Sequence, residues 1–327
     1  MNIANRARKK IRVMIGQEIN WSEHKKCFGG LNRDITFYVI RRCDTLAGVN
    51  SHFISVMGHL RYALKNGWVP IVDMQNYPNA LLDEDEVGVK NAWEFYFKQP
   101  CGYCLEEVYS SKNVILSSGF PLQFYPNDNM EFFTRYELIQ MWHQYFQKYL
   151  GFSDQLQSEI DVRYTQYFAD KKKGKVLGLF LRGTDYVSLQ PYEHPVQPSI
   201  EMAVAKTYEI IKEQGCQWVF LVTEDQNILE RFRKEFHEKL FYVKEQKRFK
   251  EMLPGEHIAE HSFHREHDRY LKGMEGLIQM GLLMKCSCLA AGRTSGSVAA
   301  MVMQPDYEYT YFWNLGRYGI DDELDKI

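Results

Sequence analysis

An arginine that directly follows an apolar run is the residue of this sequence best suited to chemistry. Arg182 directly follows the apolar run at residues 176–181, and Asp185 lies three residues after Arg182. A guanidinium beside a buried strand needs a carboxylate partner or a bound anion, because losing its hydration without either is costly. We therefore expect Asp185 either to form a structural ion pair with Arg182 or to orient it towards a diphosphate, whose oxygens suit the planar donors of arginine.

Three further polar segments follow apolar runs in the same way. They are the loop at residues 41–51, the tripeptide Thr223 to Asp225, and the hydroxyl-rich turn Gly292 to Ser297. In open parallel sheets, ligands bind at the carboxyl ends of the strands. These segments are therefore the other candidates for a ligand site.

The first half of the chain has the pattern of a βαβ unit. Thr36 to Ile40 and residues 68–72 are rich in β-branched and aromatic side chains, which is typical of strands. Between them, apolar residues recur at helical spacing from Ser51 to Lys65, after a cap at Asn50 or Ser51. Strand, helix and strand in this order predict a parallel sheet.

The same alternation restarts after a basic junction at residues 171–175. Strands are expected at 176–181, 218–222, 240–243 and 288–291, and helices at 199–213, 227–236, 270–284 and 298–303. This pattern predicts an α/β chain with two doubly wound, Rossmann-like domains that face a central cleft. The domains are expected to comprise residues 1–172 and 173–327.

Charge and cysteine content restrict the partners and the location. With 40 basic and 42 acidic side chains, the net charge is −2, so no overall field attracts nucleic acid. Seven cysteines and no apolar leader predict a reducing compartment, most simply the cytoplasm. The basic tail at residues 6–12 is either frayed or in peripheral contact with a membrane or a partner. Cys101 and Cys104 have the spacing of a redox motif, but no strand precedes them.

The motifs after the strands of the second half resemble those of one enzyme family. Residues 178–186, then 223–225, then 293–299 are similar in type and order to the donor-binding half of the α1,6- and O-fucosyltransferase superfamily. Members of that family are inverting, metal-independent transferases of GT-B fold that use GDP-fucose. The resemblance covers residues 176 to 304, and the loop at residues 47–51 resembles the family's glycine-rich loop more weakly.

The resemblance implies a role for each matching residue. Arg182 would contact the donor β-phosphate, and Asp185 would support its loop. The other residues implied in donor binding are Gly48, Asn50, His52, Thr184, Glu224, Asp225, Glu275, Arg293, Thr294, Ser295 and Ser297. It implies a GDP-sugar as donor substrate and no cofactor. The hydroxyl turn at residues 294–297 would also offer an anion the free N–H groups of a helix start.

Three positions depart from the family's pattern. Phe180 stands where the family often has histidine, Gly183 replaces a second arginine, and the aspartate that reads guanine has only Glu275 nearby, two positions away. These departures support an alternative, a non-catalytic nucleotide- or glycan-binding protein of the same fold. A thiol redox protein built around Cys101 and Cys104 is a third reading.

Inverting transfer also needs a base that deprotonates the acceptor hydroxyl. Glu193 is the candidate, since it lies in the loop after the arginine at the spacing of the family's glutamate, and His194 is the alternative. The acceptor, a glycan or a lipid-linked oligosaccharide, would meet Asp73, Asn76 and Trp93 in the first half, although core packing is favoured for Trp93.

A group of histidines could suggest a metal instead. His257, His261, His264 and His267 recur with acidic neighbours between residues 257 and 267. The tract is interrupted by Ser262 and Phe263 and no cysteine pair accompanies it, so a solvated loop is favoured over zinc. We expect no metal.

Overall fold

The computed structural model describes residues 19–171, 173–250 and 255–320, and the chain divides into two compact units. Unit 1 comprises the chain up to Pro126 together with Tyr145–Gln155 and Glu266–Gly273. Unit 2 comprises Asn127–Gln144, Leu156–Arg265 and the chain from Met274. Along the chain, the domain boundary predicted between residues 172 and 173 falls after the last strand of the first sheet and before the first strand of the second. Each unit nevertheless includes residues from both sides of this boundary.

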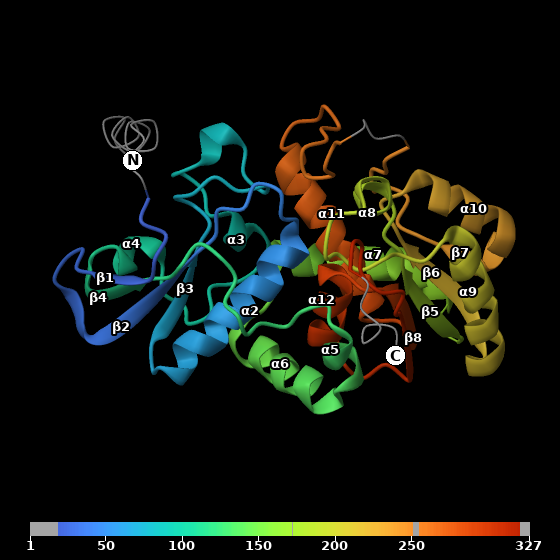
Figure 1. The fold of residues 1–327 in the computed structure, drawn as a ribbon, viewed down its shortest axis with the longest axis horizontal. Coiled ribbons are helices and arrows are strands. Elements are labelled where there is room, and N and C mark those ends of the chain that lie inside the picture. The colour runs from blue at the N-terminus through green and yellow to red at the C-terminus, as the bar shows by residue number, and fades with distance from the viewer. Residues whose placement is uncertain (1–18, 172, 251–254, 321–327) are drawn as a thin grey trace. The chain divides into compact units, whose positions relative to one another are not determined.

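Unit 1 contains a four-stranded sheet in the order β1-β4-β2-β3. Its strands are β1 (His24–Lys26), β2 (Leu31–Arg41), β3 (Val69–Asp73) and β4 (Ser111–Leu116). β2 pairs in parallel with β3 and β4, whereas β1 pairs antiparallel with β4. The expected βαβ unit is present, because helix α2 (Val49–Lys65) connects β2 to β3 (Figure 1).

Side chains of β2 alternate between two covered faces, as a strand with period two requires. Phe37 and Val39 pack with α4 (Leu105–Val108) in one apolar cluster. Tyr38 points to the opposite face, where its hydroxyl contacts His59 of α2 at 3.0 Å. Helices therefore cover both faces of this sheet.

Unit 2 contains a five-stranded sheet, parallel throughout, in the order β7-β6-β5-β8-β9. The strands are β5 (Lys175–Phe180), β6 (Cys216–Val222), β7 (Leu240–Phe241), β8 (Cys288–Gly292) and β9 (Tyr309–Trp313). Numbered along the chain, this is the order 3-2-1-4-5 of a doubly wound sheet. The strand order reverses between β5 and β8.

Helices cover both faces of this sheet as well. Leu177 and Leu179 of β5 face a cluster that includes side chains of α9 (Ile200–Gln214) and α10 (Gln226–Phe236), which lie beside β6 and β7 in Figure 1. On the other face, Phe168 of α7 (Asp154–Phe168) contacts Phe220. α11 (Asp268–Leu283) also covers this face, because Leu283 lies against Gly178.

The remaining helices are short or connect these layers. They are α3 (Ala92–Tyr96), α5 (Met130–Thr134), α6 (Tyr136–Tyr149), α8 (Thr184–Leu189) and α12 (Ser295–Met303), with 3-10 turns at Glu84–Glu86, Ala169–Lys171 and His237–Lys239. No helix in the described ranges is long and apolar enough to cross a membrane.

The predicted α/β class with two Rossmann-like parallel sheets is confirmed, and the cleft between them stays a prediction. Strand β1, a short charged strand at the edge of its sheet, was not predicted and pairs antiparallel with β4. Strand β9 was not predicted, although Tyr-Thr-Tyr-Phe-Trp has strong β propensity. The basic tail at residues 6–12 lies outside the described residues.

Candidate functional site

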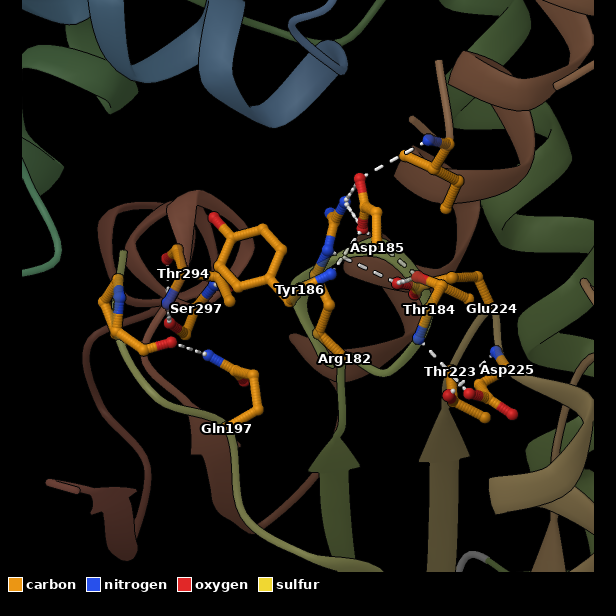
Figure 2. Close-up of polar contacts among 12 residues, drawn as sticks. Arg182, Thr184, Asp185, Tyr186, Gln197, Thr223, Glu224, Asp225, Thr294 and Ser297 are labelled. Atoms are coloured by element: carbon orange, nitrogen blue, oxygen red, sulfur yellow. Dashed lines mark hydrogen bonds and ion pairs between the residues drawn. The ribbon is translucent and has the colours of Figure 1, made fainter. Parts of the chain in front are cut away.

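Arg182 lies at the carboxyl end of β5, in contact with two carboxylates (Figure 2). Its Nη2 donates to Asp185 Oδ1 at 3.0 Å, and its Nε lies 3.4 Å from Glu224 Oε1 without the geometry of a hydrogen bond. The guanidinium also lies 4.6 Å from the centre of the Tyr186 ring. The side chain is only 24% exposed, so this cluster is largely shielded from water.

The ionisation of this cluster reflects burial and mutual attraction. Burial opposes the charged form of Arg182, but Glu224 and Asp185 outweigh it and raise the pKa of Arg182. Burial would raise the pKa of Asp185 too, yet the contact with Arg182 holds it below its ordinary value. Burial raises the pKa of Glu224 despite Arg182. Asp185 is therefore the firm counter-ion, and Glu224 is the carboxylate that accepts a proton more readily.

The backbone between Arg182 and Asp185 has an unusual conformation, and two carboxylates that directly follow β6 hold it in place. Thr184 has φ +50°, a left-handed conformation that β-branched residues rarely adopt. Its N–H donates to Asp225 Oδ2 at 3.3 Å, and its hydroxyl donates to Glu224 at 3.3 Å. Asp225 also caps α10 by accepting from the N–H groups of Asn227 and Ile228. The two strand-end motifs of β5 and β6 thus form one hydrogen-bonded unit.

A second group of polar residues follows β8, on the other side of the point where the strand order reverses. Thr294 caps α12 by accepting from Ser297 N, and Ser297 Oγ accepts from Thr294 N in return. Among the residues that the structure describes, Ser295 and Gly296 have backbone N–H groups without a hydrogen-bond partner. Figure 2 shows the Tyr186 ring standing between this turn and Arg182.

Two buried side chains hold the turn before α12 in place. Arg293 is fully buried and donates to the backbone oxygen of Asp128 at 2.8 Å and to the side chain of Asn314. Gln197 donates to the Arg293 carbonyl at 3.0 Å and lies where any side chain on Gly292 would clash. In this structure Arg293, which was predicted to bind the donor, therefore stabilises the turn before α12 through its own hydrogen bonds.

The loop after α8 carries the two candidate bases in different surroundings. The His194 ring packs edge-on against Tyr186, with centroids 5.2 Å apart. Burial lowers the pKa of His194, with Arg182 and Arg317 adding to the effect, so the ring is neutral near pH 7. Glu193 is held by its backbone, since its N–H donates to Tyr318 and its carbonyl accepts from Arg317. Both residues are exposed, so the burial of His194 is only partial.

A distant segment completes the site, and the sequence alone did not indicate it. The backbone N–H of Ile258 donates to Asp185 Oδ2 at 3.4 Å. Phe249 bridges to the loop after β6, because its N–H donates to the Glu224 carbonyl at 2.8 Å and its carbonyl accepts from Gln226. The segment between β7 and α11 therefore packs directly on the motifs after β5 and β6.

Glu275, expected to read the nucleotide base, already has a partner. Arg265 binds its carboxylate through both terminal nitrogens, at 2.5 and 3.1 Å. Both side chains are about four-fifths buried. A nucleotide base could reach this carboxylate only if Arg265 moved away. The role of Glu275 in reading the base therefore stays a prediction, and the contact with Arg265 counts against it.

The predicted residues of unit 1 gather around the start of α2. Gly48 is its N-terminal cap residue, without a side-chain cap, and a Cβ there would meet open space. Asn50 Oδ1 is buried without a hydrogen bond to any residue that the structure describes. His52 is only 1% exposed, and burial together with Arg42 lowers its pKa to about 3. His52 therefore lies inside unit 1 as a neutral side chain.

The three residues predicted to meet the acceptor are engaged within unit 1. Asp73 is fully buried and accepts from the backbone of Gln75 and Asn76, from the Asn76 side chain and from Tyr109. Trp93 is 2% exposed and stacks on Phe97 at 4.5 Å. A tryptophan buried to this degree has no open face for a sugar. Trp93 is therefore part of the hydrophobic core in this structure.

The metal and redox alternatives find little support in the geometry. The tract at residues 257–267 is a series of turns ahead of α11, so its histidines do not share a helical face. In the described ranges, one group has metal-ligand spacing, Asp83, Glu86 and His267, but Glu86 is already paired with Lys90 at 2.6 Å. Burial raises the pKa of Cys101, which disfavours a reactive thiolate. The absence of a metal stays a prediction.

The structure thus brings together Arg182, Thr184, Asp185, Glu224 and Asp225, and places the α12 turn across the strand-order reversal from them (Figure 2). Sequence reasoning missed Tyr186, Gln197 and Ile258 as parts of the site. Tyr186 lay within the motif and could have been found from its spacing after Arg182. Gln197 and Ile258 act through contacts that are distant in sequence, and no local signal marks them.

Comparisons with known proteins give structural neighbours only. No family model matches the chain, and no curated protein matches it in sequence. Fucosyltransferase NodZ from Bradyrhizobium superimposes with a TM-score of 0.49 at 15% identity, over 88% of this chain and 97% of that one. POFUT1 in complex with GDP-fucose gives 0.49 at 9% identity, over 86% and 99%. In structure, this chain is similar to solved fucosyltransferases.

Proposed function

We propose that the protein is an inverting glycosyltransferase that moves fucose or a similar hexose from a GDP-sugar to a glycan or polysaccharide intermediate. One observation carries the proposal: Arg182, with a buried Nε that lacks a hydrogen bond to any described residue, lies at the carboxyl end of β5 where the strand order reverses. Doubly wound sheets bind their ligands at this position. The choice of a GDP-sugar rests on the resemblance of residues 178–186, 223–225 and 293–299 to the fucosyltransferase motifs.

Two sources of positive charge would hold the donor diphosphate. Arg182 supplies a planar guanidinium, and the open N–H groups of Ser295 and Gly296 at the start of α12 favour an anion. Both lie in unit 2, on the two sides of the strand-order reversal. Together they would stabilise the diphosphate as it leaves, which is the part that a metal ion performs in other transferases.

Glu224 would adjust the charge of the site when the donor binds. With both carboxylates ionised, Arg182 is over-neutralised and an incoming diphosphate is repelled. Because burial already raises the pKa of Glu224, the added negative charge of the donor would favour its protonation. Asp185 would stay ionised and keep Arg182 in place through the 3.0 Å contact.

In the proposed step, the acceptor oxygen forms a bond to the anomeric carbon of the sugar while the bond from that carbon to the diphosphate breaks. The acceptor proton passes to a base, and GDP leaves with the electron pair of the broken bond. His194 is better placed than Glu193 for this role, because it contacts Tyr186 and is neutral near pH 7. A cytoplasmic location and a membrane-linked acceptor remain parts of the proposal that rest on the sequence.

Replacement of Arg182 tests the proposal. Arg182→Lys keeps the charge but loses the bidentate geometry, so GDP-sugar turnover should fall at least 10²-fold. Arg233→Ala, an exposed arginine on α10, is the matched control and should retain activity. Turnover is read as GDP released from a panel of GDP-sugars, with and without glycans. Normal turnover by the Arg182 variant would refute the site.

A non-catalytic binding protein is the competing function. It is favoured by the two carboxylates that neutralise Arg182 and by Gly183 in place of a second arginine. Calorimetry with GDP and GDP-sugars separates the two functions. Binding that depends on Arg182 but releases no sugar with any acceptor would establish the non-catalytic reading.

A further inference from the structure

Unit 1 contains two adjacent buried arginines without an acidic partner. Arg41 and Arg42, at the carboxyl end of β2, are each 1% exposed. In the part of the chain that the structure describes, no carboxylate lies within 4.0 Å of either guanidinium. A buried guanidinium without a counter-charge is strongly unfavourable, so its compensation must come from elsewhere.

Arg41 is compensated by backbone carbonyls. Its Nε donates to the Ser117 carbonyl at 2.7 Å, Nη1 donates to Asn20 at 2.9 Å and Nη2 donates to Ser22 at 3.1 Å and also to Ser117. These oxygens surround the charge with the negative ends of dipoles. Arg41 therefore needs no further ligand.

Arg42 lacks a comparable set of partners. Within the described ranges, Nη1 is the one guanidinium nitrogen of Arg42 that makes a hydrogen bond, to the Gly119 carbonyl at 2.9 Å, and the buried Nε has no partner. Asp44 is close enough to favour its charge, but burial dominates and lowers the pKa of Arg42. The Asp44 carboxylate is itself directed at the N–H groups of Leu46 and Ala47.

The face of α2 beside Arg42 carries more unpaired polar atoms. Arg42 Nη1 binds the Gly119 carbonyl and His59 Nε2 contacts the next carbonyl, that of Phe120, at 2.9 Å, so Arg42 lies beside this face of α2. His52 and Ser55 lie on the same helical face as His59. The charge of Arg42 adds to the effect of burial in lowering the pKa of both histidines. His59 is bonded to Tyr38 and Phe120. Among the described residues, Ser55 Oγ and both ring nitrogens of His52 are buried without a hydrogen bond of good geometry, although the carbonyls of Asp44 and Ala47 lie near enough to accept the N–H of the ring.

We propose that a small monovalent anion, chloride in the cell, binds beside Arg42 beneath α2. The anion would accept from Arg42 Nε and from the Ser55 hydroxyl. A water molecule would satisfy some of these donors but would leave the buried charge of Arg42 uncompensated. Burial of both side chains favours a monatomic ion over a phosphate group. This site is separate from the proposed transfer reaction and would hold whether or not that reaction occurs.

Bromide locates the anion directly, without any variant. Crystals of the full chain grown or soaked in sodium bromide should show an anomalous peak beside Arg42 Nε, close to Ser55. The proposal would be overturned if no anomalous peak appeared at this position, or if an ordered water lay there while bromide occupied other sites.

Thermal unfolding measures whether the anion stabilises the fold. At constant ionic strength, exchange of sodium gluconate for sodium chloride should raise the Tm by about 2 °C per tenfold increase in chloride above its Kd. Arg42→Met should remove this chloride dependence, and Ser55→Ala should shift it to several-fold higher chloride. Arg33→Met, an exposed arginine in the same strand, should keep it. Equal Tm values of the wild type in gluconate and chloride would contradict the site even if Arg42→Met fails to fold.

Discussion

The space that a side chain would need at Gly183 is occupied by the carboxylate of Asp225. A Cβ built on Gly183 would lie 2.3 Å from Asp225 Oδ2 and 2.9 Å from its Cβ. The same Oδ2 accepts from the N–H of Thr184, and Oδ1 caps α10. The glycine that departs from the fucosyltransferase motif is therefore required by the way this chain joins the ends of β5 and β6.

Gly183→Ala should destabilise unit 2 by about 1–3 kcal/mol, because the loop or Asp225 must move to admit the methyl group. The measurement is urea unfolding followed by fluorescence. Gly151→Ala, where a Cβ meets open space, is the control and should change stability by less than about 0.5 kcal/mol. An unchanged midpoint for Gly183→Ala would contradict the close packing.

A second substitution can confirm the cause. Asp225→Ala alone should cost about 1 kcal/mol through the lost cap of α10. If the clash is with Asp225, the double variant should be less destabilised than the sum of the single variants. Strict additivity would show that Gly183 is constrained by something other than this carboxylate.

The elements of the fold that could be predicted are those with strong local patterns. β5 and β6 are continuous apolar runs buried on both faces, and α9 and α10 begin and end within a few residues of the expected positions. β1 could not be predicted, because His-Lys-Lys has no apolar side chain and pairs through its backbone at an edge.

The candidate site was predictable only where its residues follow strands. Arg182, Asp185 and Glu224 meet because β5 and β6 are parallel neighbours with adjacent ends. Trp93 illustrates the opposite case, since an aromatic residue of the short helix α3 could face a sugar or the core, and only tertiary packing decides. The contact of Ile258 with Asp185 spans 73 residues, and nothing local indicates it.

His194→Ala should reduce GDP-sugar turnover by about 10²–10⁴-fold if this ring is the base, while Glu193→Gln should have little effect. Because burial lowers the pKa of His194 from its ordinary value of 6.5, the ring stays neutral at pH values somewhat below 6.5. The acidic limb of the wild-type kcat/KM profile should therefore have its midpoint below pH 6.5. The measurement is the pH dependence of all three proteins, and loss of the limb in Glu193→Gln instead would assign the base to Glu193.

Glu224→Gln should make the stability of unit 2 less dependent on pH. Burial raises the pKa of Glu224 above 4.5, so the folded state binds its proton more tightly than the unfolded state. That contribution is complete below pH 4.5 and is lost as pH rises through the raised value. Urea unfolding between pH 4.5 and 8 should show a steeper decline for the wild type than for the variant. Glu213→Gln, an exposed change on α9, should follow the wild type, and parallel curves for Glu224→Gln would contradict the prediction.

Thr294 and Ser295 are adjacent at the start of α12, and their replacement should have different effects. Thr294→Val removes the oxygen that accepts from Ser297 N, so it should lower the free energy of unfolding by about 1–2 kcal/mol. Ser295 makes no hydrogen bond within the described residues, so Ser295→Ala should leave stability unchanged within about 0.5 kcal/mol. If the turn binds a diphosphate, Ser295→Ala should still weaken GDP binding several-fold in calorimetry. Thr294→Ser, which keeps the capping oxygen, should restore stability. A loss of stability in Ser295→Ala equal to that in Thr294→Val would show that both hydroxyls only support the helix, and the diphosphate assignment of this turn would fail.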